Sequence, residues 1–341
     1  MGYDNLRLEK GMYRQEGMNF TQVLESLDPS ENYRGTALEG TDAFQRQLKR
    51  FGIRVKGAGS SPVEKFFRTT DSAVLFPEYI ARTVRQGMEE NDILSNIVAT
   101  TTMIDSMDYR TIYSTAAKSD KELKSVAEGA EIPSTEITTK ENLVQLTKRG
   151  RMLVASYEAL RFQKLDLFSV MLRQIGAHIQ KQQLNDAVNV LVNGDGNDNL
   201  STLYEVGSEP ISGISGTLGY DQLVEFWSQF DPYTMNTILC SNATMTMLLK
   251  IPELQNPLTG LNFQGTGKLE TPLGAQLYRT NAVTDNLIIG LDKRYALELV
   301  RVGDVMVEYD KLIDRQLERA AITSISGFGR IYDDAVAVLQ V

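Results

Sequence analysis

The stretch LDLFSVMLRQIGAHIQKQQLNDAVNVLVNG, residues 165–194, carries the strongest secondary-structure signal in the chain. Asp166 suits the start of a helix and Gly194 is a typical stop. A helix over 166–193 would run about 42 Å at about 1.5 Å per residue, so we expect it to form the spine of the fold. Its apolar residues recur at spacings of three and four, which is the period of one helix face: Phe168, Leu172, Ile175, Ile179, Leu184, Ala187, Val188 and Leu191.

The segment that follows, NGDGNDN at 193–199, resembles the start of a calcium loop because Asp195 and two asparagines alternate. A calcium loop of the EF type also needs glycine at its sixth position and glutamate at its twelfth. Counted from Asp195, those positions hold Leu200 and Val206. Since glycine and asparagine tolerate the left-handed turn that ends a helix, a turn is the favoured interpretation and a metal site the alternative.

Residues 1–70 are expected to form an N-terminal arm. MNFTQVLESLD at 18–28 and TDAFQRQLKRFGI at 41–53 predict short amphipathic helices, the second capped by Thr41 or Asp42. KGAGSSP at 56–62 has the composition of a flexible linker. Helices this short cannot bury a core alone, so they need the rest of the chain or a neighbouring molecule.

Residues 71–157 change from a helical to an alternating pattern. A helix is expected to begin near Pro77, because proline suits the first turn. TMIDSMDYRTIYS at 102–114 alternates as a strand does, and NLVQLTKRGRMLVAS at 142–156 is a second strand-like run. The residues between them are polar and charged, which predicts a long two-stranded hairpin over 104–148 with a solvated tip.

Residues 199–302 alternate between helix and strand patterns, and residues 303–341 return to strands. This order indicates that 199–302 is a module inserted into another domain. The spine helix before it and the strands after it would then belong to one discontinuous domain. That domain is expected to comprise 71–103, 149–198 and 303–341, in a chain of the α+β class.

Composition limits the function. The 341 residues are 42% apolar and 23% charged, with a net charge of −9, one cysteine and one histidine. An acidic chain does not favour tight nucleic-acid binding, and no secretory signal or membrane span is evident. The lone histidine, His178, lies in a helical pattern and is expected to be an ordinary helix residue. No catalytic or metal-binding constellation emerges, so we expect neither enzyme activity nor a cofactor.

The order of these parts resembles the major capsid proteins of tailed bacteriophages with the Hong Kong 97-type coat fold. Four segments are similar in sequence to coat proteins of phages from Gram-positive bacteria: DAFQRQLKRFGI at 42–53, FFRTTDSAVLFPEYIARTVRQGM at 66–88, NLVQLTKRGRMLVAS at 142–156 and GFGRIYDDAVAVL at 327–339. The resemblance covers nearly the whole chain, although no single motif is diagnostic.

The resemblance implies a separate role for each part of the chain. The hairpin at 104–148 would be the E-loop, which lies over a neighbouring subunit, and 199–302 would be the axial domain. The arm would reach adjacent subunits or act in assembly. Assembly contacts are expected from charged residues of the hairpin and from a basic patch in the arm: Lys118, Lys121, Glu122, Lys124, Glu128 and Glu131, with Arg46, Lys49 and Arg50. Lys140 is expected to be another exposed charge of the hairpin, which selects register between subunits or only keeps the loop soluble.

The same resemblance implies a virion protein, made and assembled in the host cytoplasm. It would form pentamers and hexamers of an icosahedral shell around double-stranded DNA, with a portal protein and a scaffolding protein or protease as further partners. The charges of the hairpin would select register between subunits, or only keep the loop soluble. The basic patch would meet a scaffold, an acidic neighbour or the genome.

Other interpretations stay open at this point. Some relatives of this type are cross-linked through a hairpin lysine, and some lose their N-terminal segment to a protease, for which 56–62 would be an accessible site. An encapsulin shares the coat fold, but the arm here is longer than encapsulins have. An α/β enzyme on 199–300 would need an acid/base pair, and Asp221 and Glu225 share only a helix face.

Overall fold

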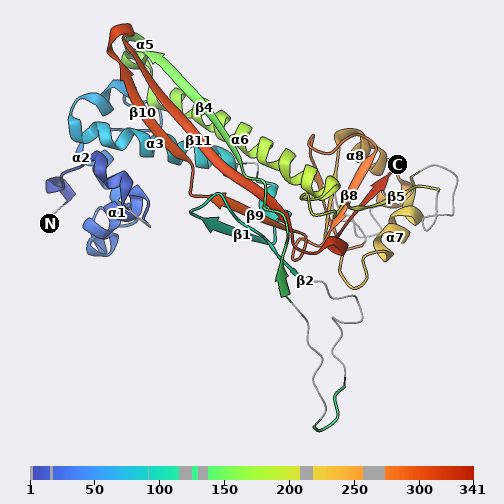
Figure 1. Ribbon diagram of the computed structural model, residues 1–341. Helices are drawn as coiled ribbons and strands as arrows, with labels where there is room; N and C mark the ends of the chain where they lie inside the picture. The colour runs from blue at the N-terminus through green and yellow to red at the C-terminus, as the bar shows by residue number, and fades with distance from the viewer. Residues whose placement is uncertain are drawn as a thin grey trace. The chain divides into compact units, whose positions relative to one another are not determined.

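The computed structural model describes residues 3–15, 18–90, 92–114, 125–129, 137–207, 218–255 and 273–341 (Figure 1). The chain forms two compact units, and each unit combines three separate parts of the sequence. Unit 1 comprises Met1–Asn91, Arg149–Ile179 and Asp304–Ser324, and unit 2 comprises Asp92–Lys148, Gln180–Gly303 and Ile325–Val341. Among the described residues, no helix combines the length and the apolar character that crossing a membrane requires.

Unit 1 is built from helices that pack on the strands β4, β10 and β11. Strands β10 and β11 pair antiparallel from Met306↔Thr323 to Leu312↔Leu317, and β4 also pairs with β11 (Figure 1). The elements are α1 (Phe20–Leu27), α2 (Ala43–Arg50), α3 (Thr70–Glu89), β4 (Thr147–Ser156), α5 (Tyr157–Phe162), the first part of α6 (Leu165–Asn193), β10 (Met306–Leu312) and the first part of β11 (Leu317–Arg330).

Helix α6 confirms the spine helix predicted over 166–193, and α1 and α2 confirm the two short helices. The helix expected to begin near Pro77 starts seven residues earlier, so that prediction is wrong. Thr69 and Ser72 form a reciprocal capping box that starts α3 at Thr70. Buried residues on both sides of Pro77, including Phe76, hold the helix together although proline donates no backbone hydrogen bond.

The apolar core of unit 1 includes the N-terminal helices. Phe20 and Leu24 of α1, and Phe44 and Leu48 of α2, belong to the same buried cluster as residues of α3 and α6 such as Leu75, Ile80, Leu165 and Leu172. The segment 18–53 therefore buries its apolar face on its own chain.

Helices α3 and α6 approach each other at two glycines. A Cβ atom on Gly176 would lie 2.0 Å from the carbonyl oxygen of Val84, and one on Gly87 would lie 2.1 Å from that of Arg173. Neither distance is possible for real atoms, so the crossing requires the absence of both side chains. Glycine inside a helix costs about 1 kcal/mol relative to alanine, and here that cost permits close packing.

Unit 2 contains a five-stranded sheet in the order β5-β12-β8-β6-β7. It also contains β1 and β9, which belong to the five-stranded sheet of β10, β11 and β4, because β9 pairs with β1 and with the end of β11. Its elements are β1 (Thr100–Ile104), β2 (Ile112–Ser114), β3 (Ile137–Thr139), the second part of α6, β5 (Thr202–Glu205), α7 (Tyr220–Ser228), β6 (Thr237–Cys240), α8 (Asn242–Leu248), α9 (Pro252–Gln255), β7 (Gln276–Arg279), β8 (Leu287–Leu291), β9 (Leu297–Val302) and β12 (Val336–Gln340).

Both faces of the five-stranded sheet are covered. Val336 and Val338 of β12 pack in one cluster with Leu184 and Leu191 of α6, whereas Ala337 and Leu339 face a second cluster that contains residues of α7 and α8. This alternation explains why VAVLQ reads as a continuous apolar run, as strands buried on both faces do.

The predicted hairpin is only partly a paired ribbon in the described residues. The antiparallel pair β2–β3 joins Ile112 to Thr139, but β1 pairs with β9 and β4 pairs with β11. The alternating strand expected at 102–114 is interrupted by bends at 105–107. The start of the first run and the end of the second thus join one sheet of the body, and the end of the first run pairs with 137–139, before the predicted second run begins.

Cys240 is expected to be unreactive in the folded protein. Its side chain is fully buried, and that burial raises the pKa of the thiol to about 12, so the reactive thiolate is scarce at neutral pH. We expect no alkylation by iodoacetamide at pH 8 over an hour in buffer and complete alkylation in urea, measured by mass spectrometry. Rapid modification of the native chain would contradict this placement.

Candidate assembly surfaces

The base of the hairpin is tied together by backbone hydrogen bonds below the β2–β3 pair. The amide of Lys140 donates to the carbonyl of Thr111 at 2.9 Å, and that of Val144 donates to the carbonyl of Tyr109 at 2.9 Å. Of the predicted contact residues in the hairpin, Glu128 is exposed. Lys118, Lys121, Glu122, Lys124 and Glu131 lie outside the described residues.

Lys140 is buried, so the expectation that it is an exposed hairpin charge is wrong. Its Nζ donates to Asp195 Oδ2 at 3.0 Å and to the carbonyl of Arg330 at 2.8 Å. The two side chains of the ion pair are only 4% and 2% exposed. Lys140 therefore fastens the returning strand of the hairpin to the body of unit 2, which a solvated lysine would not do.

Asp195 is the centre of this buried group. Burial alone would raise the pKa of its carboxyl group, but hydrogen bonds from Asn197 and from the Arg330 amide, together with the Lys140 charge, lower that pKa below the ordinary value. The Arg330 amide donates to Oδ2 at 2.9 Å, and Asn197 Nδ2 donates to Oδ1 at 2.9 Å. Asp195 is thus held in its charged form.

Arg330 is fully buried and completes the group. Its Nη1 donates to the carbonyl of Asn199 at 2.6 Å and to Ser201 Oγ at 3.0 Å, and Nη2 donates to the carbonyl of Asp333 at 2.5 Å. Burial lowers the pKa of the guanidinium, while the charges of Asp333, Asp195 and Asp334 oppose that shift. We call Lys140, Asp195 and Arg330 the hairpin anchor.

The loop NGDGNDN therefore serves as a helix stop and as part of the anchor. Helix α6 ends at Asn193, and Gly194 follows with a φ of 79°, as the sequence predicted. Asn142 of the hairpin adds two contacts: its amide donates to Asn197 Oδ1 at 3.0 Å and its Nδ2 donates to the carbonyl of Gly196 at 2.6 Å. No group of three His, Cys, Asp or Glu side chains in the described ranges is arranged to hold a metal ion.

The basic patch of the arm is smaller than predicted, because Arg46 is completely buried. Arg46 Nε donates to Asp28 Oδ2 at 2.7 Å, Nη1 donates to the carbonyl of Thr41 at 2.5 Å, and the guanidinium lies 4.3 Å from the ring centre of Tyr33. Arg46 thus acts as an internal tie between α1 and α2 rather than as a surface contact.

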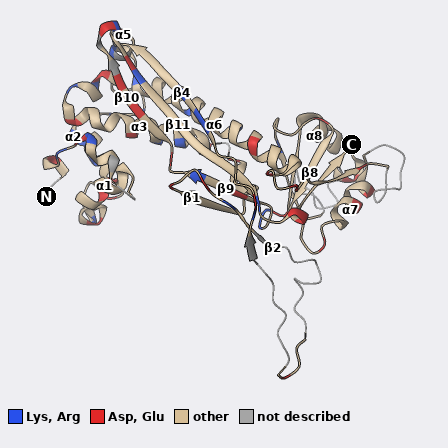
Figure 2. Cartoon of the chain, in the orientation of Figure 1, with Lys and Arg blue, Asp and Glu red and all other residues tan. Residues whose placement is uncertain are grey.

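The other two residues of the patch remain accessible to different degrees. Lys49 is exposed, whereas Arg50 is half-buried and donates to the carbonyl of Leu6 at 2.5 Å. Figure 2 colours the Lys and Arg positions of α2 blue along the ribbon, but of the three predicted contact residues on this helix only Lys49 is fully exposed.

The segment expected to be a flexible linker, 56–62, is hydrogen-bonded to the start of α6. The amide of Leu165 donates to the carbonyl of Ser61 at 2.9 Å, and the amide of Gly57 donates to Asp166 Oδ1 at 3.1 Å. Lys164 Nζ also donates to the carbonyl of Ala58 at 3.1 Å. Segment 56–62 is therefore held in place and is not a flexible linker, because its backbone has partners distant in sequence that its composition does not reveal.

Sequence reasoning missed an exposed apolar face on unit 1. Phe162 at the end of α5 is 78% exposed, and Leu167, Val170 and Met171 in the first turns of α6 are 62%, 51% and 50% exposed. The signal was present, because the first turns of α6 carry apolar residues on the outward side as well as on the inward side. Such a helix is usually covered on all sides.

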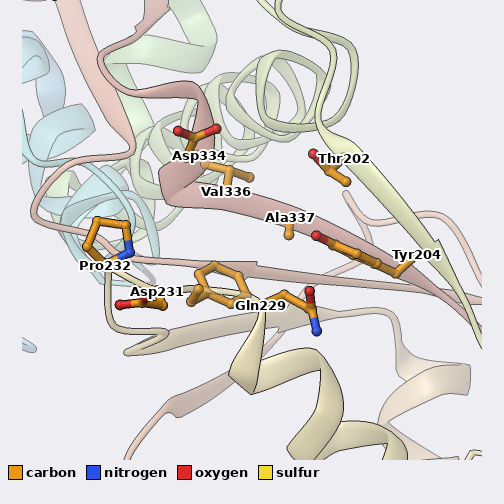
Figure 3. Close-up of a pocket in the computed structure, with 9 residues that line it drawn as sticks. Thr202, Tyr204, Gln229, Asp231, Pro232, Asp334, Val336 and Ala337 are labelled. Atoms are coloured by element: carbon orange, nitrogen blue, oxygen red, sulfur yellow. The ribbon is translucent and has the colours of Figure 1, made fainter. Parts of the chain in front are cut away.

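A cleft of about 200 Å³ lies in unit 2 between the end of α7 and strands β5 and β12 (Figure 3). Its lining includes Tyr204, Gln229, Asp231 and Asp334. Figure 3 shows the two carboxylates at separate places on the rim, not directed at a common point. Asp221 and Glu225, the pair considered for an enzyme, are not among the lining residues.

Comparison with known proteins agrees with this architecture. A family model described as phage capsid protein matches residues 139–334, which is more than half of the chain. No curated protein sequence matches the chain. Three solved particles share the fold at low sequence identity.

The first is a virus-like particle from Pyrococcus furiosus, with 12% identity, a TM-score of 0.52, and 78% of this chain and 99% of that chain covered. The second is the capsid of an empty GTA particle, with 12% identity, a TM-score of 0.52, and 72% and 88% covered. The third is the capsid of the cyanophage P-SCSP1u, with 14% identity, a TM-score of 0.50, and 72% and 87% covered.

The α+β architecture with its spine helix is thus the Hong Kong 97-type coat fold that the sequence predicted. Copies of such a chain form a shell, and its place is the capsid of the virion. On the match of the family model over residues 139–334, this chain belongs to the phage capsid protein family.

Proposed function

We propose that copies of this chain form the pentamers and hexamers of an icosahedral shell around double-stranded phage DNA, and that the hairpin at 104–148 lies over a neighbouring subunit. The observation that carries the proposal is the hairpin anchor. An extended hairpin has little core of its own and is marginal in isolation. The buried pair of Lys140 and Asp195 fixes its base, so a neighbour meets a hairpin that leaves the body in one direction.

Residues 199–302 are proposed as the axial domain, whose loops meet around the symmetry axes, together with strand β12, which lies between β5 and β8 in the same sheet. Residues 71–103 and 149–198, with the rest of 303–341, are proposed as the peripheral domain. Residues 18–53 are not proposed as an arm on neighbours, because their apolar side chains are buried within unit 1. The exposed Lys49 and Glu128 and the predicted hairpin charges remain candidates for contacts that select register.

Partners are proposed from the same family relationship: a portal protein, a scaffolding protein or protease, and the packaged genome without tight binding. The net charge of −9 supports the last point, since an acidic shell repels phosphates and leaves DNA free to enter and leave. Assembly is proposed to take place in the cytoplasm of the host bacterium.

Electron microscopy of the purified chain, alone and with a candidate scaffolding protein, tests this function. We expect hollow, uniform particles with five-fold vertices, which bind added DNA weakly and in a salt-dependent way. A chain that stays monomeric under both conditions at high concentration would contradict the proposal.

A further inference from the structure

The first turns of α6 present an apolar surface that no described residue of unit 1 covers. On the inward side, Leu165, Phe168 and Leu172 are buried in the core. On the outward side, Leu167, Val170 and Met171 are half exposed or more, and Phe162 directly before the helix is 78% exposed. We name these four outward residues the α6 apolar face.

The face has a sharp limit. The next outward positions of the helix are Gln174 and His178, and both are exposed polar residues, as an ordinary solvated helix face requires. Exposed residues of both signs adjoin the face in the sequence: Glu158, Arg161, Lys164 and Asp166. An apolar centre with a polar, charge-balanced rim is the anatomy of a protein–protein interface.

The balanced charges beside the α6 apolar face favour a protein partner over DNA or an anionic lipid surface. DNA and anionic lipid surfaces attract clusters of Lys and Arg, and here two acids balance two bases. No charged residue occurs from Leu167 to Leu172, so a second acidic chain can approach this face without repulsion across it. In a shell, copies of the same chain are the partner present in the highest number.

We propose that a second copy of this chain covers the α6 apolar face in the assembled shell. The inference rests on the shell function and adds a defined contact surface to it. Phe162 and Met171 are of the residue types that bury well at such interfaces, because an aromatic ring gives a large contact area and a methionine adapts its shape. Within a ring of copies such a contact is heterologous, so the surface that meets it there is a different part of the second copy.

The first test uses Leu167→Gln/Met171→Gln and follows assembly against protein concentration by light scattering. We expect the double variant to need at least ten times more protein for shell formation, while the melting temperature of the dispersed chain stays unchanged. The matched control, Gln174→Ser/His178→Gln, lies on the same side of the same helix beyond the face and is expected to assemble like the parent. Assembly of the double variant at the parental concentration would overturn the inference.

A second test does not depend on assembly yield. Because Cys240 is buried, Val170→Cys introduces the one thiol expected to react quickly with a maleimide. We expect rapid labelling of dispersed chains and strong protection in purified shells. Equal labelling in closed shells would overturn this inference and leave the shell function standing, whereas failure of any chain to form shells would remove both. Protection only on phosphatidylcholine–phosphatidylglycerol vesicles would identify a lipid surface instead and also overturn the inference.

Discussion

Lys140→Met is expected to lower the free energy of unfolding by about 3 kcal/mol or more, because it leaves the carboxylate of Asp195 buried without its cation. The methionine fills a similar volume, so loss of packing contributes little. The measurement is urea unfolding of the dispersed chain followed by far-UV circular dichroism. Lys49→Met is the matched control, since Lys49 is exposed, and it is expected to change stability by less than about 0.5 kcal/mol.

The pair of Lys140 and Asp195 can be separated from other effects by a double-mutant cycle. In the parent, Asp195→Asn is expected to destabilise, because it removes the charge that Lys140 pairs with. In the Lys140→Met background, the same change is expected to stabilise by about 1 kcal/mol or more, because it removes an unpaired buried charge. A change of the same sign and size in both backgrounds would show that the two side chains are not coupled.

Acid should weaken the hairpin anchor, although Asp195 protonates in the folded chain only at a lower pH than carboxyl groups with an ordinary pKa. The pKa of Asp195 is lower in the folded chain than in the unfolded one, so its contribution is present above the unfolded pKa and is lost as the pH falls through the folded pKa. The parent is therefore expected to lose more stability between pH 5 and pH 2 than Asp195→Asn, as measured by urea unfolding at each pH. The same loss in both proteins would place the acid sensitivity at other groups.

The hairpin anchor also shows why the fold could be predicted from the sequence more easily than the buried polar contacts that stabilise it. The period of apolar residues in 165–194 is local, and it predicted α6 to within one residue at the start. Lys140 and Asp195 are separated by 55 residues, and Arg330 lies a further 135 residues along the chain. Each of the three looks like a solvated polar residue when only its neighbours in sequence are considered.

The same limit applies to Arg46 and to the segment 56–62. Arg46 belongs to a run without acids, yet Asp28, 18 residues earlier, pairs with it in the interior. Segment 56–62 is rich in Gly and Ser, which favours a linker, but the hydrogen bond between its Gly57 amide and Asp166 spans 109 residues. Composition reports what a segment tolerates, whereas tertiary contacts decide whether it is held.

The α6 apolar face differs from these long-range contacts, because the apolar residues that form it are close together in the sequence. Phe168 and Leu172 suffice for the inward stripe, so Leu167, Val170 and Met171 are surplus to a helix with one buried face. Apolar residues that exceed what the chain itself can bury indicate a surface for another molecule.

The second large effect is expected at the crossing of α3 and α6. Gly176→Ala places a Cβ atom where the carbonyl oxygen of Val84 lies 2.0 Å away and the amide nitrogen of Met88 lies 2.9 Å away. Both obstacles are backbone atoms of a helix, so neither can turn aside as a side chain would. The helices have to separate, and core contacts such as those of Ile80 and Leu172 loosen along with them.

We expect Gly176→Ala to lower the free energy of unfolding by about 3 kcal/mol, at the upper end of overpacking effects. The sign is informative, because alanine at an open helical position would raise stability by about 1 kcal/mol through helix propensity alone. Urea unfolding of the dispersed chain measures the change. Gly11→Ala is the control: a Cβ there meets no atom within 4 Å, so the change in stability should stay within about 0.5 kcal/mol. A Gly176→Ala chain as stable as the parent would mean that the two helices do not cross at these glycines.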